Sequence, residues 1–300
     1  MRKPNFFILG APKCGTTSLA AWLRDHPEIF MPKLKEPHFF NTDDRQGVAT
    51  LSYYESLFRG ATSRHVAVGE ASVWYLSSTE AVRNILCYQP QARFIVMVRN
   101  PVEMAPALHQ EMLLSGHENV SNFQAAWNLQ TERSQGQSLP LLGWARRRFL
   151  YGECCALGAQ LNRLLADVSK DAVLVIVLDD LDDNPRREYL RVLQFLGVRD
   201  DGRNEFPVYN KARMPRWPGI ARFLFIMIQI RRKLGFKAGL NLWNIISRLN
   251  KIETQRTSLP PESTAALRKY FARDVELLGQ LLGRDLSYWL ASQRARRPAP

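Results

Sequence analysis

Short apolar runs alternate along the chain with segments in which apolar residues recur at helical spacing. The first run, residues 5–9 (NFFIL), is followed by Gly10 and is typical of a strand buried on both faces. Strands are likewise predicted at 66–68, 93–98 and 173–178. Helices are predicted at 17–26, 77–88, 101–115, 119–134, 151–167, 185–196 and 261–283. The helix at 77–88 is expected to begin with a capping box of Ser77 and Glu80.

This alternation predicts an α/β fold, in which a central parallel β-sheet is flanked by helices on both faces. We expect a single domain over residues 1–300, with a basic, apolar insertion at about 211–256. Residues 211–256 contain eleven basic residues and one acid, Glu253. Three interpretations of this insertion are open: a core helix followed by a basic loop, a helix that lets 220–237 contact an anionic membrane, and a basic surface for an acidic polysaccharide.

Composition and charge narrow the class of protein. The chain has 300 residues, 46% of them hydrophobic, and a formal net charge of +13, which favours anionic partners such as nucleotides, acidic glycans or anionic membranes. Its four cysteines form no CxxC pair, so neither a zinc site nor a disulfide framework is expected. Reduced thiols favour a cytoplasmic protein, either free or peripheral at the membrane. No nucleic-acid-binding motif is present, and nucleic acid is not an expected partner.

The sequence GAPKCGTTS at 10–18 lies between the first predicted strand and the first predicted helix. In such a loop, backbone N–H groups and the positive end of the helix form an anion site. Gly15 lets the backbone approach a ligand closely, and Lys13 supplies a charge on a flexible stem. The residues expected to bind a phosphate-like group are Lys13, Cys14, Gly15, Thr16, Thr17 and Ser18.

The position of the lysine distinguishes this loop from one that binds Mg-NTP. A Walker loop carries lysine directly after its second glycine, where this chain has Thr16. Asp179 and Asp180 follow a predicted strand and could still act as the acids of a kinase. A P-loop-type ATP-dependent kinase is therefore one alternative. A non-catalytic basic protein that binds membranes or polyanions is another.

Two further motifs contain groups suited to catalysis and to anion binding. In KEPHFF at 35–40, Pro37 ends any preceding helix and places Glu36 and His38 close together on an irregular segment. A carboxylate there can remove a proton from a hydroxyl, which typically contributes roughly 10²–10⁴-fold in rate. Arg99 follows the predicted strand 93–98, and ligands of parallel sheets bind at the carboxyl ends of strands.

Together the loop, KEPHFF and the strand followed by RNPVE resemble the sulfotransferases that use 3′-phosphoadenosine 5′-phosphosulfate (PAPS). The similarity is to the carbohydrate and heparan-sulfate branch and its bacterial relatives, and it covers about 5–210 and 258–290. It implies a single sulfotransferase domain with a P-loop-NTPase-like core and an activity of the EC 2.8.2 type. In that reaction the sulfuryl group moves in line from PAPS to a hydroxyl or amine, and no metal is needed. The implied acceptor is a carbohydrate, a glycolipid or another hydroxyl-bearing molecule.

The resemblance also implies roles for individual residues. Lys13 would stabilise the charge on the leaving 5′-phosphate, and the amides of the loop would bind the phosphosulfate. Glu36 would be the general base on the acceptor, and His38 would orient Glu36 or the sulfuryl oxygens. Arg99 would bind the 3′-phosphate, and Lys211 is expected in a basic loop over the nucleotide.

The chain departs from the family pattern at Ala107, where the family usually has a serine that also binds the 3′-phosphate. Pro106 is expected to interrupt the helix at this point. Either another donor such as His109 or Lys211 assists Arg99, or the affinity for the nucleotide is lower.

Overall fold

The structure, a computed structural model, describes residues 2–44, 47–48, 50–141, 145–209, 213–233, 250–253 and 259–291. The chain divides into two compact units. Unit 1 consists of residues 1–100, 157–209 and 273–300, and unit 2 of 101–156 and 210–272. The boundary falls inside the long helix α13 (Pro261–Leu282). The single domain with an insertion at 211–256 stays a prediction, and residues 211–212, 234–249 and 254–256 of that insertion lie outside the described residues.

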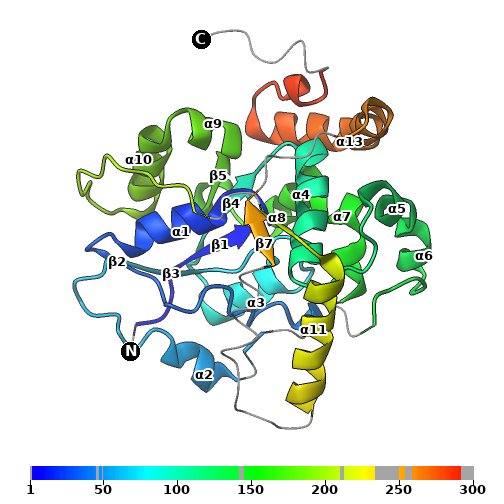
Figure 1. Cartoon of the computed structure of the whole chain (residues 1–300). Coiled ribbons are helices and arrows are strands. Elements are labelled where there is room, and N and C mark those ends of the chain that lie inside the picture. The colour runs from blue at the N-terminus through cyan, green and yellow to red at the C-terminus, as the bar shows by residue number, and fades with distance from the viewer. Residues whose placement is uncertain are drawn as a thin grey trace. The chain divides into compact units, whose positions relative to one another are not determined.

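A five-stranded parallel sheet with the strand order β2-β3-β1-β4-β5 forms the centre of unit 1 (Figure 1). The sheet confirms the predicted α/β architecture. β1 is entirely buried, as its continuous apolar run predicts, and it pairs with β3 on one side and β4 on the other. The strands are β1 (Phe6–Gly10), β2 (Ile29–Phe30), β3 (Ala67–Ala71), β4 (Arg93–Val98) and β5 (Val173–Val177).

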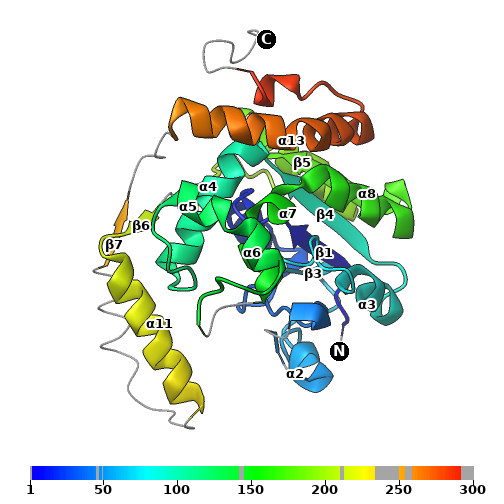
Figure 2. The same cartoon turned by 90° about the vertical axis from the view of Figure 1, so that its right-hand side faces the viewer.

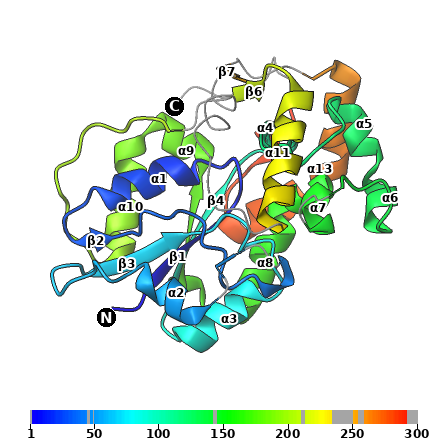
Figure 3. The same cartoon turned by 60° about the horizontal axis from the view of Figure 1, so that its bottom comes forward.

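Helices cover both faces of this sheet. On one face lie α1 and α10, and on the other α3 and α8 (Figure 3). The chain runs from β1 to β2 and β3 on one side and then crosses to β4 on the other, so the strand order reverses at β1 and β4. Ligands of open α/β sheets bind at such a point. The helices of unit 1 are α1 (Thr16–Arg24), α2 (Leu51–Ser56), α3 (Ala81–Tyr88), α8 (Leu157–Asp167), α9 (Leu178–Asp183) and α10 (Pro185–Leu196), with short 3₁₀ turns at Thr42–Asp44, Lys170–Ala172 and Ser287–Trp289.

Unit 2 is mainly helical (Figure 2). Its core contains a fully buried ion pair, in which Nη1 of Arg133 lies 2.7 Å from Oε2 of Glu118, and the Tyr151 hydroxyl donates to the same carboxylate at 2.7 Å. Of the helices that the structure describes, none combines the length and apolarity needed to span a bilayer. The elements of unit 2 are α4 (Pro101–Leu114), α5 (Phe123–Asn128), α6 (Gln130–Ser134), a 3₁₀ turn at Arg146–Phe149, α7 (Tyr151–Cys155), α11 (Pro218–Lys233) and the antiparallel pair β6 (Arg213–Pro215) and β7 (Lys251–Glu253).

Several predicted helix limits were wrong. α3 begins at Ala81, because the hydroxyl of Ser78 accepts hydrogen bonds from the N–H groups of Glu80 and Ala81; the capping box from Ser77 does not form. α4 continues through Pro106, so the predicted interruption is wrong; the helix lacks one hydrogen-bond donor there and resumes its regular pattern. The predicted helices at 119–134 and 151–167 are each divided in two, into α5 and α6 and into α7 and α8.

Candidate functional site

The loop between β1 and α1 is fixed against the neighbouring strands. The N–H of Ala11 donates to the carbonyl of Met97 on β4 at 2.8 Å. Gly15 is the N-cap of α1 and has a left-handed φ of 86°, which glycine adopts without penalty. A Cβ at Gly15 would lie 3.0 Å from Cδ1 of Leu178, so the packing also favours glycine at this position.

The predicted anion donors lie at the start of α1. The N–H of Cys14 donates to the carbonyl of Ala11 at 3.4 Å, and the N–H of Ser18 donates to that of Gly15 at 3.0 Å. The first N–H groups of a helix lack intrahelical acceptors, so the amides of Gly15 and Thr16 occupy the positions suited to an anion. Lys13 precedes them with a left-handed φ of 64°. Such a φ is uncommon for a residue with a Cβ, and it often marks a functional site.

Two side chains of the loop have structural roles. Burial raises the pKa of the Cys14 thiol to about 12, and the neighbouring Arg99 and Lys13 cations only partly oppose this. Cys14 is therefore a neutral, fully buried thiol that fills space rather than a nucleophile. The hydroxyl of Ser18 accepts a hydrogen bond from the N–H of Tyr209 at 3.0 Å. It thereby fixes the segment that leads towards Lys211, which itself lies outside the described residues.

Arg99 and the loop are brought together, as the rule for strand ends predicts. Arg99 directly follows β4, the neighbour of β1, and is only 4% exposed. Its Nη1 donates to the backbone carbonyl of Lys13 at 3.2 Å. The guanidinium therefore lies beside the loop that is predicted to bind an anion.

Ala107, which replaces the family's serine, and His109, one of the two alternative donors for the 3′-phosphate, lie on α4 in unit 2. Ala107 is half-buried there. His109 is 2% exposed, its Nε2 is bonded to the carbonyl of Val120 at 2.8 Å, and its ring packs against Phe123 and Tyr151. Burial also lowers the pKa of this imidazole. His109 is thus a core histidine of unit 2, and the structure gives no support to its prediction as a nucleotide donor.

Glu36 and His38 lie side by side, as predicted, on the irregular segment that follows Lys35. Nε2 of His38 is 3.3 Å from Oε2 of Glu36, and Nζ of Lys35 is 2.5 Å from Oε1 of the same carboxylate. The N–H of Glu36 donates at 3.0 Å to the carbonyl of Ala71, the last residue of β3. The segment is therefore attached to the carboxyl end of the strand next to β1.

The surroundings of Glu36 keep it ionised. Burial by itself would raise the pKa of this carboxyl. The hydrogen bond from His38 and the Lys35 ammonium outweigh burial and lower the pKa to about 2. A carboxyl with such a pKa is in its charged form at neutral pH.

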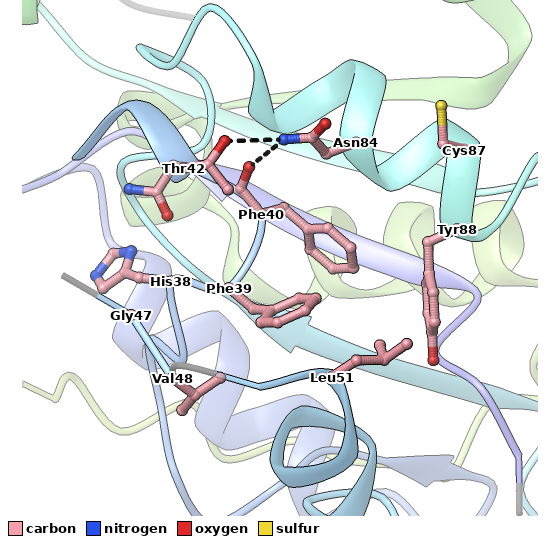
Figure 4. Close-up of a pocket in the computed structure, with 11 residues that line it drawn as sticks. His38, Phe39, Phe40, Thr42, Gly47, Val48, Leu51, Asn84, Cys87 and Tyr88 are labelled. Atoms are coloured by element: carbon pink, nitrogen blue, oxygen red, sulfur yellow. Dashed lines mark hydrogen bonds between the residues drawn. The ribbon is translucent and has the colours of Figure 1, made fainter. Parts of the chain in front are cut away.

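A cavity of about 660 Å³ begins at the His38 ring and extends between the 38–48 segment, α2 and α3 (Figure 4). The ring of Phe39 and the side chains of Leu51 and Tyr88 face it, while Asn84 lies at its rim and donates to the carbonyl of Phe40 at 2.8 Å. The space is large enough for one or two sugar rings or a ligand of similar size.

The acids that a kinase would need are engaged elsewhere. Oδ2 of Asp179 accepts hydrogen bonds from the Tyr288 hydroxyl at 2.9 Å and from Nε1 of Trp289 at 2.8 Å. Asp180 forms an ion pair with Arg284, whose Nη1 is 2.5 Å from Oδ2. Within the described part of the chain no cluster of three or more histidine, cysteine or acidic side chains is placed to hold a metal ion.

A family model described as the sulfotransferase domain matches residues 3–206, about two thirds of the chain. The chain belongs to the sulfotransferase family. The match includes the loop at 10–18, Glu36, His38 and Arg99, and it ends before Lys211. The resemblance to this family is confirmed.

Similar proteins include carbohydrate-directed members of the same family. This sulfotransferase is 28% identical over 250 residues to carbohydrate sulfotransferase 15 of Mus musculus, covering 65% of this chain and 44% of that protein. It is 36% identical over 104 residues to heparan sulfate glucosamine 3-O-sulfotransferase 6 of Homo sapiens, covering 35% and 29%. The chain thus spans less than half the length of these relatives. The crystal structure of a sulfotransferase from Alicyclobacillus acidocaldarius superposes with a TM-score of 0.73 at 25% identity, covering 97% of this chain and all of that one.

Sequence reasoning missed a buried polar cluster beside the segment that carries Glu36 and His38. Glu70 on β3 is 1% exposed and accepts hydrogen bonds from the hydroxyls of Ser72, Tyr75 and Tyr54. The one available signal was a glutamate in the middle of the buried run AVGEA, since a buried carboxylate requires partners.

Proposed function

We propose that this protein transfers the sulfuryl group of PAPS to a hydroxyl or amine of a carbohydrate-type acceptor. The observation that carries the proposal is the pair of Glu36 and His38, 3.3 Å apart, on a segment bonded to the end of β3. The anion-binding loop follows β1, the next strand in the sheet. A base and a phosphosulfate site at the ends of adjacent strands are what in-line transfer requires.

In the proposed reaction the acceptor oxygen attacks sulfur while the bond between sulfur and the 5′-phosphate oxygen breaks. Glu36 takes the proton of the acceptor hydroxyl, and 3′-phosphoadenosine 5′-phosphate (PAP) leaves. Lys13 and the amides at the start of α1 stabilise the negative charge that develops on the leaving phosphate. Each donor of this kind is typically worth about 2.7–4 kcal/mol in the transition state. Arg99, beside the loop, pairs with the 3′-phosphate, and Lys211 is proposed to assist it.

We propose that the acceptor occupies the cavity beside His38 (Figure 4). The names of the similar proteins support a saccharide, and the aromatic faces of Phe39 and Tyr88 are suited to packing against sugar rings. Filling the cavity with Leu51→Trp should raise the KM for the acceptor and leave PAP affinity unchanged. An equal weakening of acceptor binding and of PAP binding would contradict this placement of the acceptor.

The direct test is transfer of radioactive sulfate from labelled PAPS to a panel of oligosaccharides and glycolipids, without added metal. Wild-type protein is expected to label at least one acceptor. Glu36→Gln should lower the turnover roughly 10²–10⁴-fold and leave the affinity for PAP unchanged. Glu205→Gln, at an exposed carboxylate, is the matched control. ATP turnover that depends on Mg²⁺, with no transfer from PAPS, would favour the kinase alternative.

A second proposal concerns α11. Trp217 before this helix and Phe223 and Ile230 within it are 54%, 57% and 42% exposed, and Arg216 lies over the Trp217 ring. An exposed apolar face beside basic residues suits the headgroup region of an anionic membrane. Co-sedimentation with phosphatidylserine vesicles at low salt should be strong for wild type and weak for Phe223→Ser. The absence of co-sedimentation for the wild type would exclude this membrane contact. The location of the protein, in the cytoplasm either free or at a membrane, stays a prediction.

A further inference from the structure

The base of this site lies on a strained backbone. Glu36 and His38 have φ values of 63° and 49°, in the left-handed region that residues with a Cβ rarely adopt. Two such residues within a stretch of three persist only where the surroundings fix the backbone, and such strain is characteristic of functional sites. The contacts that fix this segment therefore also determine the direction of the Glu36 carboxylate.

Three successive backbone N–H groups of the segment are bound by two side-chain hydroxyls. The N–H of His38 donates to Oγ of Ser72 at 3.1 Å. The N–H groups of Phe39 and Phe40 both donate to the hydroxyl of Tyr75, at 2.9 and 3.3 Å. The backbone that follows the base is thus bound to side chains just beyond β3 rather than to a neighbouring strand.

Both hydroxyls donate to one buried carboxylate, that of Glu70. Oγ of Ser72 lies 2.8 Å from Oε2, and the hydroxyl of Tyr75 lies 2.9 Å from Oε1. In its ionised form a carboxylate only accepts hydrogen bonds, so each hydroxyl then directs its proton towards Glu70. Its lone pairs are then available to the backbone N–H groups on the other side.

We propose that Glu70 is a positioning residue for sulfuryl transfer: through Ser72 and Tyr75 it holds residues 38–40 in the conformation that aims Glu36 at the acceptor. This inference rests on the proposed function of Glu36 as the base. Glu70 itself is 1% exposed and acts through the two hydroxyls.

Burying an ionised Glu70 costs free energy. A carboxylate at such a position is therefore expected to serve function rather than stability. Burial raises its pKa to about 7, although the hydrogen bonds from Ser72, Tyr75 and Tyr54 oppose the rise, and the nearby Glu36 adds to it. Stability alone would favour an apolar side chain at this position of β3, which is buried along its whole length.

The chain offers a matched control. The hydroxyl of Tyr54, on α2, donates to Oε1 of Glu70 at 3.2 Å, as that of Tyr75 does. Of these two tyrosines, however, only Tyr75 also accepts hydrogen bonds from residues 38–40, among the hydrogen bonds of the described residues. Tyr75→Phe and Tyr54→Phe therefore each remove one bond to Glu70 and keep the aromatic ring, but only Tyr75→Phe releases Phe39 and Phe40.

The test compares Tyr75→Phe, Ser72→Ala, Glu70→Gln and Tyr54→Phe in the full-length protein by two readouts. Hydrogen–deuterium exchange of the peptide that covers 36–40 does not depend on activity. It should be at least tenfold faster in the first three variants and unchanged in Tyr54→Phe. In the sulfate-transfer assay the first three should lose at least tenfold in kcat with PAP affinity within twofold of wild type, while Tyr54→Phe stays within twofold for both.

Equal effects of Tyr75→Phe and Tyr54→Phe, accompanied by equal losses in Tm, would overturn the proposal and leave Glu70 a purely structural residue. Unchanged exchange at 36–40 in Glu70→Gln would overturn it as well. If wild type transfers no sulfate from PAPS but exchange rises as described, the positioning of 38–40 by Glu70 holds and the proposed reaction fails.

Discussion

The guanidinium of Arg99 donates a 3.2 Å hydrogen bond to the backbone carbonyl of Lys13. These residues follow β4 and β1, which are neighbours at the point where the strand order of the sheet reverses. One arginine therefore both contacts the loop proposed to bind the phosphosulfate and lies where the 3′-phosphate of PAPS is proposed to bind.

The two roles of Arg99 can be separated by the choice of nucleotide. If Arg99 pairs with the 3′-phosphate, Arg99→Ala should lower the affinity for PAP by about ten- to a hundredfold, the equivalent of a lost charge-assisted hydrogen bond. The affinity for AMP, which lacks the 3′-phosphate, should fall much less. Calorimetric titration of the wild type and Arg99→Ala with PAP and with AMP measures the fold-loss in affinity for each nucleotide. An equal fold-loss for the two nucleotides would mean that Arg99 only fixes the loop.

If Glu36 acts as the proposed base, its pKa determines the acidic limb of the pH profile of kcat/KM. The carboxyl has its pKa lowered to about 2, with the His38 hydrogen bond and the Lys35 charge outweighing burial, so it stays ionised as the pH falls. Lys35→Met removes one of these stabilising groups, so the pKa should rise and the acidic limb of kcat/KM should move to higher pH. Lys33→Met, at an exposed lysine, is the control and should not move the limb. An unshifted limb in Lys35→Met would show that another group controls it.

Gly15 should not tolerate a side chain. Gly15→Ala places a Cβ 3.0 Å from Leu178 and forces a left-handed φ on alanine, which is expected to cost about 1–3 kcal/mol of unfolding free energy. It should also weaken PAP binding, because the amides at the start of α1 move. Gly202→Ala has a similar φ of 75° with no atom within 4 Å, so it should cost less and leave PAP binding intact. Denaturant titration and PAP titration of both variants test this, and equal losses would contradict the steric argument.

Removing one partner of the ion pair in the core of unit 2 is expected to destabilise that unit strongly. Both side chains of Glu118 and Arg133 are fully buried, so Arg133→Met leaves an uncompensated carboxylate and should cost about 3–5 kcal/mol. Arg83→Met breaks a pair with Asp167 in which Arg83 is 73% exposed, and should cost less than about 1 kcal/mol. Chemical denaturation measures both, and a loss below 1 kcal/mol for Arg133→Met would show that the core rearranges.

Much of the site could be predicted from local pattern. The loop, Glu36 with His38, and Arg99 were predicted because strand ends meet at one edge of a parallel sheet and because short motifs preserve their spacing. The hydrogen bonds that connect Glu70, Ser72 and Tyr75 to residues 38–40 could not be predicted, because they join segments far apart in the sequence. The partners of Asp179 and Asp180 could not be predicted for the same reason, since they come from the C-terminal segment. The predicted start of α3 was wrong because Ser78, rather than the neighbouring Ser77, bonds to the first N–H groups of the helix.

The central claim is that the loop with Lys13 binds a 3′-phosphorylated adenosine nucleotide without metal. The most direct measurement is the thermal stabilisation of wild type and Lys13→Ala by PAP, ATP and ADP in the presence of a chelator, with Lys33→Ala as the control. A ligand at about 100 times its Kd that binds only the folded state adds about 2.7 kcal/mol of stability, which is readily detected. We predict that PAP stabilises wild type and Lys33→Ala far more than ATP or ADP does, and that Lys13→Ala loses most of this effect. Greater stabilisation by ATP, or none by PAP, would contradict the assignment of PAPS as the sulfuryl donor.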